Sequence, residues 1–350
     1  MERRNKIAVL FGGASTEYEI SLQSAHAVIT SMDQQKYEPV LIGIHRDGRW
    51  FYYQGEPERI LADSWFCPET CTPVAISTDR RSPGLLLLEP EGPRLLPLDA
   101  AFPVLHGKNG EDGTVQGVLS LANIPVIGCG VLSSALCMDK EMAHRVAAAA
   151  GVKIPLSFLI TKQTKADAIS EAADILHYPL FVKPVCSGSS FGITRVTEPE
   201  ELNAAVREAF AHDDRVLLEE AIPGFEVGCA VLGTEDPTVG EVDEIELSQG
   251  FFDYTEKYTL KTSRIHVPAR ISPEKAAEIK WTALKIYRAL DCSFFARVDL
   301  FLTPEGEIYF NEVNTIPGFT VHSRYPNMLK AAGIPFSLLV DRLIEMAVKR

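Results

Sequence analysis

Two strand-like segments near the C-terminus carry acidic and amide side chains at spacings that suit a divalent cation. The segments FFARVDLFL and EIYFNEVN are joined by a short turn with the sequence TPEG. A hairpin centred on that turn pairs positions whose numbers sum to about 611, so Asp299 lies opposite Glu312 and Arg297 opposite Asn314. Two facing carboxylates and an amide oxygen are hard ligands of the kind Mg²⁺ prefers. The alternative is a solvated face on which Arg297 pairs with an acid.

A second segment, KPVCSGSSFG at 183–192, has the composition of a phosphate-binding loop. Small residues allow backbone N–H groups to converge on an anion, and Lys183 supplies a positive charge. The Walker pattern GxxxxGK[ST] is absent, and by itself such a turn can equally be a flexible hairpin. Lys140, in the helical segment MDKEMAHR, is a second candidate phosphate ligand, although an isolated helix lysine is usually only solvated.

Two glycine-rich loops follow strand-like runs in the N-terminal third. FGGASTE lacks the GxGxxG fingerprint, which argues against a nicotinamide cofactor. LHGKNGEDGT, at 105–114, places His106 and two acids after a strand, where open α/β sheets bind ligands. A single His in such a loop is more often a hydrogen-bonded structural residue than a catalyst.

These residues need a scaffold, and the apolar periodicity predicts an α/β fold. Strand-like runs at 5–11, 37–44, 98–105 and 124–127 alternate with a helix after Gly13 and another at 114–123, which favours a parallel sheet covered by helices. The proline-rich stretch 54–97 predicts irregular structure.

The remainder of the chain predicts two further α+β units. The spacing predicts one long helix from Ser133 to about Ala150, then strands and two helices over 154–222. Hairpin-like strands follow from 225, with a polar aromatic loop at 250–264 and a helix over 273–290. A C-terminal helix is predicted over 335–349, with an apolar face formed by Leu338, Leu339, Leu343 and Ile344.

Composition narrows the classes of partner. The 350 residues are 46% hydrophobic and carry 34 basic and 47 acidic side chains, a net charge of −13. This balance argues against nucleic acid or an anionic membrane as partner, and no apolar run is long enough to span a bilayer. The seven scattered cysteines form no metal-binding pattern, so we expect reduced thiols and a cytoplasmic protein.

Taken together, the motifs resemble the D-alanine:D-alanine ligase family. They are FGGASTEYEISL, HGKNGEDGTVQG, MDK, VKPVCSGSSFG, DYTEKY, ARVD and NEVNTIPGFT, in the family's order over nearly the whole chain. The resemblance implies an ATP-grasp fold of three lobes: an N-terminal Rossmann-like domain (1–128), a central ATP-grasp subdomain (129–222) and a C-terminal one (223–350) with a lid at 250–264. It also implies ATP-dependent joining of two D-amino acids for peptidoglycan precursors, by a homodimer.

The resemblance further implies a role for individual residues. The magnesium ligands, for two ions that Mn²⁺ could replace, would be Asp299, Glu312 and Asn314. The implied ATP contacts are Lys140, Phe181, Lys183, Ser187, Gly188, Ser190, Glu219, Glu220, Ile222, Glu226, Phe251, Lys257 and Phe310. The implied catalytic set is Glu17, Ser189, Tyr258, Arg297 and Gly318, in which Glu17 also holds the first D-alanine. The remaining implied substrate contacts are His106, Asp243, Ser323 and Arg324.

Two features bear on the second substrate. The lid keeps Lys257 and Tyr258, as in family members that use a D-amino acid rather than D-lactate. Arg324 stands where ordinary D-alanine:D-alanine ligases usually have an apolar residue, and this combination is most similar to the D-alanine:D-serine ligases of the vancomycin-resistance group. We therefore expect D-serine as acceptor, with Asp243 receiving its hydroxyl. The alternatives are a housekeeping D-alanine:D-alanine ligase, a different ATP-grasp carboxylate-amine ligase and a non-catalytic binding module.

Overall fold

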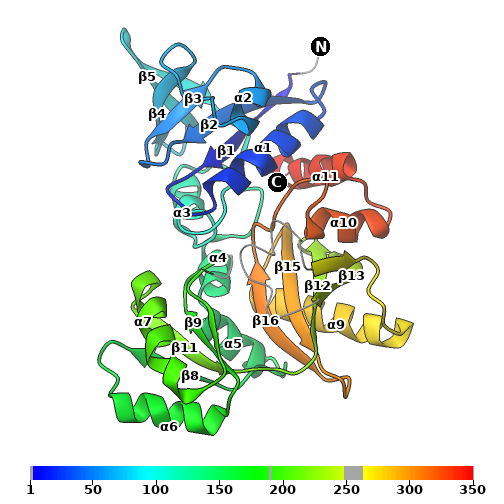
Figure 1. Ribbon diagram of the computed structural model, residues 1–350. Coiled ribbons are helices and arrows are strands. Elements are labelled where there is room, and N and C mark those ends of the chain that lie inside the picture. The colour runs from blue at the N-terminus through cyan, green and yellow to red at the C-terminus, as the bar shows by residue number, and fades with distance from the viewer. Residues whose placement is uncertain (1–2, 189–190, 248–262, 350) are drawn as a thin grey trace.

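The computed structural model describes residues 3–188, 191–247 and 263–349, and it contains three β-sheets (Figure 1). The first sheet has the order β6-β5-β4-β3-β2-β1-β7. At its centre, β1 (Asn5–Gly12) pairs in parallel with β2 (Tyr37–Ile44) and with β7 (Ala100–Pro103). The helices of this lobe are α1 (Tyr18–Ser31), α2 (Pro57–Leu61) and α3 (Thr114–Leu121). The predicted parallel α/β unit is therefore confirmed.

Two details of this lobe differ from the sequence-based expectation. The proline-rich stretch is not irregular, because it adds three antiparallel strands to the sheet: β4 (Cys71–Ser77), β5 (Gly84–Glu89) and β6 (Gly92–Pro97). They extend the sheet beyond β3 (Trp50–Tyr53), which pairs antiparallel with both β2 and β4. Pro93 and Pro97 lie in β6, the edge strand of the sheet, where proline is tolerated. The expected strand at 124–127 is reduced to one bridge, between Ala101 and Val126.

The second and third sheets are antiparallel. The second has the order β10-β9-β11-β8, with β8 (Ser157–Thr161), β9 (Leu180–Pro184), β10 (Thr194–Val196) and β11 (Arg215–Glu220). It is accompanied by α6 (Ala166–Leu176), a short 3-10 turn (Pro199–Glu201) and α7 (Leu202–His212). The third has the order β14-β13-β12-β15-β16, with β12 (Phe225–Leu232), β13 (Thr238–Leu247), β14 (Ser263–His266), β15 (Phe295–Leu302) and β16 (Ile308–Asn314). Its helices are α9 (Pro273–Ala289) and α10 (Arg324–Ala331).

The long helix expected from Ser133 is in fact two helices, α4 (Val131–Met138) and α5 (Lys140–Ala149). Asp139 separates them in an extended conformation, and its side chain accepts a hydrogen bond from the Met142 N–H at 3.0 Å. An Asp at this position is an effective N-cap, and Arg215 holds the same carboxylate at 2.6 Å. The break starts α5 at Lys140, one of the expected phosphate ligands.

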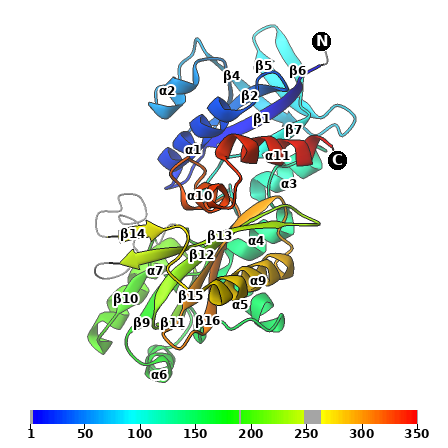
Figure 2. The same cartoon turned by 90° about the vertical axis from the view of Figure 1, so that its right-hand side faces the viewer.

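The C-terminal helix α11 (Phe336–Val348) returns to the first lobe, where it lies beside α1 and β7 (Figure 2). Leu339, Leu343 and Ile344 are buried as predicted, but Leu338 is exposed and Val340 takes its place in the core.

The hydrophobic cores show how the lobes are joined. Phe102 of β7 packs against Phe295 of β15 and Phe319, with ring centroids 5.9 and 5.7 Å apart, so the first and third sheets share one core. The second sheet packs against α6 and α7 in a separate core. The three sheets fall within the three predicted residue ranges, while the division at residues 128 and 222 stays a prediction. None of the described helices has the length and apolar character needed to cross a membrane.

Candidate active site

The β15–β16 hairpin has the predicted register. Asp299 pairs with Glu312 and Arg297 with Asn314. The Arg297 guanidinium grips the Asp299 carboxylate from Nε at 2.8 Å and from Nη2 at 2.7 Å, and Asn314 Nδ2 donates to the same carboxylate at 3.0 Å. Asp299 is almost wholly buried, so these donors replace the water it lost on folding. The alternative to a metal site was a solvated face on which Arg297 pairs with an acid. Arg297 does pair with an acid, but the pair lies in the interior rather than on a solvated face.

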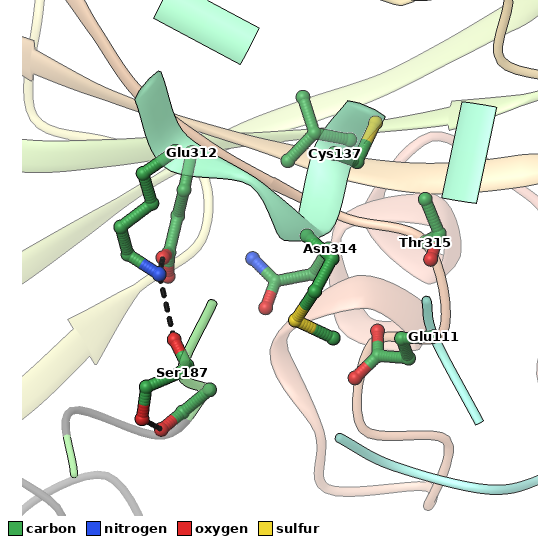
Figure 3. A pocket seen from close by; sticks show the side chains of 10 residues that line it. Glu111, Cys137, Ser187, Glu312, Asn314 and Thr315 are labelled. Carbon is green, nitrogen blue, oxygen red and sulfur yellow. Dashed lines mark hydrogen bonds and ion pairs between the residues drawn. The ribbon is translucent and has the colours of Figure 1, made fainter. Parts of the chain in front are cut away.

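Glu312 faces a pocket between the end of β16 and the loop that follows β9 (Figure 3). Lys140 Nζ lies 3.4 Å from the Glu312 carboxylate and donates to the Ser187 carbonyl oxygen at 2.6 Å. Besides these three residues, the lining consists of Glu111, Cys137, Met138, Gly188, Val313, Asn314 and Thr315. The pocket thus brings together the hairpin, the start of α5 and the phosphate-loop segment, which are far apart in the sequence.

The predicted metal ligands suit a divalent cation that shares its coordination shell with other oxygens. Within the part of the chain that the structure describes, no group of three or more His, Cys, Asp or Glu side chains is arranged to hold a metal by itself. Asp299, Glu312 and Asn314 offer two carboxylates and one amide oxygen, which leaves coordination positions for phosphate oxygens and water. Lys140 at the same pocket suits an anion bound next to that ion.

Lys183 and Glu219 form a buried ion pair on neighbouring strands of the second sheet. The Lys183 ammonium also lies 5.4 Å from the centroid of the Phe181 ring. Glu220, next along β11, points elsewhere: it accepts a hydrogen bond from the Leu156 N–H at 2.7 Å. Phe310 of β16 is fully buried, and its ring centroid lies 5.4 Å from that of His144, whose Nδ1 is 4.0 Å from Glu219.

Glu17 is buried at the start of α1, where two glycine loops approach its carboxylate. A Cβ at Gly107 would overlap Glu17 Oε2, and one at Gly188 would lie only 2.9 Å from that atom. Gly107 also has a backbone φ of +72°, a conformation that residues with a side chain rarely adopt. Glycine at both positions therefore allows a loop of the first lobe and the phosphate-loop segment of the second to close around one carboxylate.

His106 is held within the structure rather than presented to a ligand. Its Nδ1 lies 2.8 Å from the Ile316 carbonyl oxygen, and its Nε2 lies 3.1 Å from the Ser24 hydroxyl. Burial lowers the pKa of this imidazole. These hydrogen bonds connect the first lobe to the segment that follows β16. This agrees with the expectation that a single His in such a loop is more often a hydrogen-bonded structural residue than a catalyst.

Glu111 is a site residue that the sequence analysis did not single out. Its two carboxylate oxygens accept the N–H groups of Gly107 at 2.9 Å and Ile316 at 2.8 Å. Burial, together with the negative charge of Glu17, raises the pKa of Glu111 to about 8. The GEDG sequence hinted at a functional loop, but only the fold shows which of its two acids enters the pocket.

Arg324 lies at the centre of a buried charge cluster, where α10 meets the third sheet. It binds Asp243 through Nε at 2.7 Å and Nη2 at 2.8 Å, and Glu226 through Nη1 at 2.9 Å. Its Nη2 is also 3.4 Å from Asp299. Although burial opposes the charge, Asp243 and Asp299 raise the pKa of Arg324 well above its usual value. The two residues expected to recognise the acceptor are thus bonded to each other.

The other predicted residues are distributed as follows. Ser323 precedes α10 and binds the Thr320 hydroxyl at 2.8 Å, and Gly318 lies beside it. Ile222 is half-buried in the link between the second and third sheets. Five of the predicted residues lie outside the described ranges: Ser189, Ser190, Phe251, Lys257 and Tyr258.

Comparison with known proteins extends over the whole chain. Residues 6–129 match the family described as "D-ala D-ala ligase N-terminus", and residues 147–345 match "D-ala D-ala ligase C-terminus". A "D-alanine--D-alanine ligase" of Caldicellulosiruptor bescii is 44% identical over 99% of this chain and 95% of its own. A "Putative D-alanine--D-lactate ligase" of Streptomyces coelicolor is 45% identical over 99% of this chain and 98% of its own.

Among solved structures, the VanG D-Ala:D-Ser ligase from Enterococcus faecalis superposes with a TM-score of 0.92. It is 55% identical, and the match covers 99% of this chain and 100% of that one. These similarities confirm the predicted ATP-grasp fold.

The raised pKa of Glu111 predicts a pH-dependent stability. A carboxyl group that binds its proton more tightly in the folded state adds to the unfolding free energy. This contribution is fully present below the pKa of the group in the unfolded chain, about 4.3. That contribution is lost as the pH rises toward about 8. We expect the wild type to lose more unfolding free energy between about pH 5.5 and 8.5 than Glu111→Gln does, as measured by urea denaturation.

Glu111→Gln loses one of the two hydrogen-bond acceptors, which changes the unfolding free energy of the variant by a similar amount at every pH. The pH dependence of the unfolding free energy can therefore still be compared with that of the wild type. Equal losses for the two proteins would show that Glu111 does not titrate in this interval.

The Arg324 cluster predicts a strong coupling between two residues. Arg324→Leu leaves Asp243 charged and unpaired in the interior, which we expect to cost about 3–5 kcal/mol in unfolding free energy. In Arg324→Leu/Asp243→Leu that charge is gone, so a large part of the stability should return. A double variant no more stable than Arg324→Leu, measured by the same denaturation, would refute the pairing.

Proposed function

The chain belongs to the D-alanine:D-alanine ligase family of ATP-dependent, peptide-forming enzymes, and from that premise we propose that it joins D-alanine to D-serine. The product would serve as a peptidoglycan precursor of the vancomycin-resistance type. The observation that carries the choice of acceptor is the buried Arg324–Asp243 pair beside Asp299. We further propose a cytoplasmic homodimer.

The donor substrate would bind first, with its ammonium at Glu17. That carboxylate lies where loops of two lobes meet, next to Gly107 and Gly188. A buried carboxylate is a strong partner for an ammonium and a poor one for a neutral group. It would fix the D-alanine carboxylate toward the phosphate pocket, ready to be phosphorylated.

ATP would lie between the second and third sheets, with Lys140 and Lys183 as its cationic contacts. Lys140 is at the pocket of Glu312 and Asn314, and Lys183 is further into the second sheet. Magnesium held by Asp299, Glu312 and Asn314 would neutralise phosphate oxygens in that pocket. Transfer of the γ-phosphoryl group to D-alanine gives an acyl phosphate, whose phosphate is a good leaving group.

Attack by the amine of the second substrate produces a tetrahedral oxyanion, for which Arg297 is the proposed stabilising residue. Asp299 occupies the Nε and Nη2 edge of the Arg297 guanidinium, so the Nη1 end is directed away from that carboxylate. Together with the Gly318 N–H, it supplies fixed donors in a site that excludes water. Water exclusion matters because an exposed acyl phosphate would hydrolyse.

The acceptor would lie beside Arg324 and Asp243. Both carboxylate oxygens of Asp243 are bound by Arg324, yet each oxygen retains a lone pair that can accept the serine hydroxyl. A site that hydrogen-bonds a hydroxyl discriminates far more strongly than an apolar pocket. The similarity to the VanG D-Ala:D-Ser ligase supports the same acceptor.

A housekeeping D-alanine:D-alanine ligase is the second candidate. This candidate is supported by the Caldicellulosiruptor bescii relative, which is named as a D-alanine--D-alanine ligase. Its sequence identity of 44% is close to the 45% of the Streptomyces coelicolor relative, which is named as a putative D-alanine--D-lactate ligase. In that case Arg324 would serve the stability of α10 and not the choice of acceptor.

Competition between acceptors tests the proposal. With Mg-ATP, D-alanine and an equal concentration of D-serine, we expect mainly D-alanyl-D-serine by mass spectrometry, and release of ADP. In Arg324→Leu the ratio of D-alanyl-D-serine to D-alanyl-D-alanine should fall by about tenfold or more. Because both products come from the same folded molecules, the ratio is insensitive to any loss of folded protein.

Lys330→Leu, on the exposed end of the same helix, is the matched control and should leave the ratio unchanged. Mainly D-alanyl-D-alanine from the wild type would establish the housekeeping activity instead.

A further inference from the structure

His144 is a buried residue beside Glu219 of the proposed ATP site, and the mechanism above does not use it. It lies on α5 one turn beyond Lys140, about 6 Å further along the helix axis. The residue is 2% exposed, and its ring meets the Phe310 ring edge-on, with 5.4 Å between centroids. It also lines a second pocket, together with Ile154, Phe158 and Tyr309.

Hydrogen bonding fixes the tautomer of this imidazole. His144 Nε2 lies 2.8 Å from the Asn311 carbonyl oxygen. A carbonyl oxygen can only accept, so Nε2 carries the hydrogen. Burial lowers the pKa of His144, which keeps the ring neutral. Nδ1 is consequently a bare acceptor.

That acceptor faces a second one. His144 Nδ1 is 4.0 Å from Glu219 Oε2, and both atoms are buried without a hydrogen-bond partner among the described residues. The other oxygen of Glu219 is bound by Lys183. Two unsatisfied buried acceptors side by side are costly unless a donor joins them.

We propose that these two atoms together recognise the exocyclic amino group of the adenine base, so that His144 helps to select ATP. An amino nitrogen placed about 3 Å from both acceptors fits their 4.0 Å separation and has one hydrogen for each. A base with a keto oxygen at that position would bring a third acceptor against the other two. This inference rests on the proposed ATP site, to which it adds a residue that reads the base.

The test compares ATP with purine riboside triphosphate, which differs only by a hydrogen in place of the amino group. Dissociation constants are measured calorimetrically with Mg²⁺ and without D-alanine. His144→Phe keeps the ring and its contact with Phe310 but removes both nitrogens. We expect this variant to lower the preference for ATP by about 3–10-fold, because one hydrogen bond to the amino group is lost.

His144→Asn retains an acceptor near the Nδ1 position and should keep most of the preference. Loss of the hydrogen bond to the Asn311 carbonyl affects the binding of both nucleotides equally, so it does not change the ratio of their dissociation constants. An equal weakening of both nucleotides in His144→Phe would overturn the proposal and indicate a structural role or a bridging water. Dipeptide formation by the wild type, measured on the same preparation, reports separately on the proposed ligase activity.

Discussion

The opposition of Asp299 and Glu312 across one hairpin is the constraint on which the rest of the site depends. Two carboxylates paired on adjacent strands repel each other, and Asp299 is also removed from water. The chain surrounds them with cations: Arg297 from the same strand, Arg324 from α10 and Lys140 from α5. Arg324 and Lys140 thereby fix α10 and α5 against the hairpin. Because the two carboxylates are stabilised by cations from other elements, those elements are held next to the hairpin and form the candidate active site with it.

The cores complement this arrangement. The first and third sheets share an aromatic core around Phe295, which makes the proposed donor site at Glu17 and the hairpin parts of one packed body. The second sheet has a core of its own. It meets the pocket through the Lys140 contact with the Ser187 carbonyl and the approach of Gly188 to Glu17. Both contacts lie where the proposed nucleotide and D-alanine would bind.

Local patterns could be predicted from the sequence, and tertiary pairings could not. The hairpin register followed from two short strands and a tight turn, since pairing there is set by a few adjacent residues. The helix break at Asp139 was missed because its cap is stabilised by Arg215, which is distant in sequence. The strands at 71–97 were missed because their prolines resemble loop composition. The loop at 105–114 was predicted to bind a ligand, but not which of its acids enters the pocket, because Glu111 is held by Ile316, which is distant in sequence. His144 gave no signal, since its position depends on Glu219.

Binding of Mn²⁺ in the presence of ADP tests most directly whether the facing carboxylates hold a divalent cation. Free Mn²⁺ is followed by electron paramagnetic resonance in the wild type, in Glu312→Gln and in Glu305→Gln, whose residue is exposed in the turn of the same hairpin. We predict that Glu312→Gln binds the ion at least about tenfold more weakly, while Glu305→Gln binds it as the wild type does. Wild-type affinity in Glu312→Gln would contradict the account.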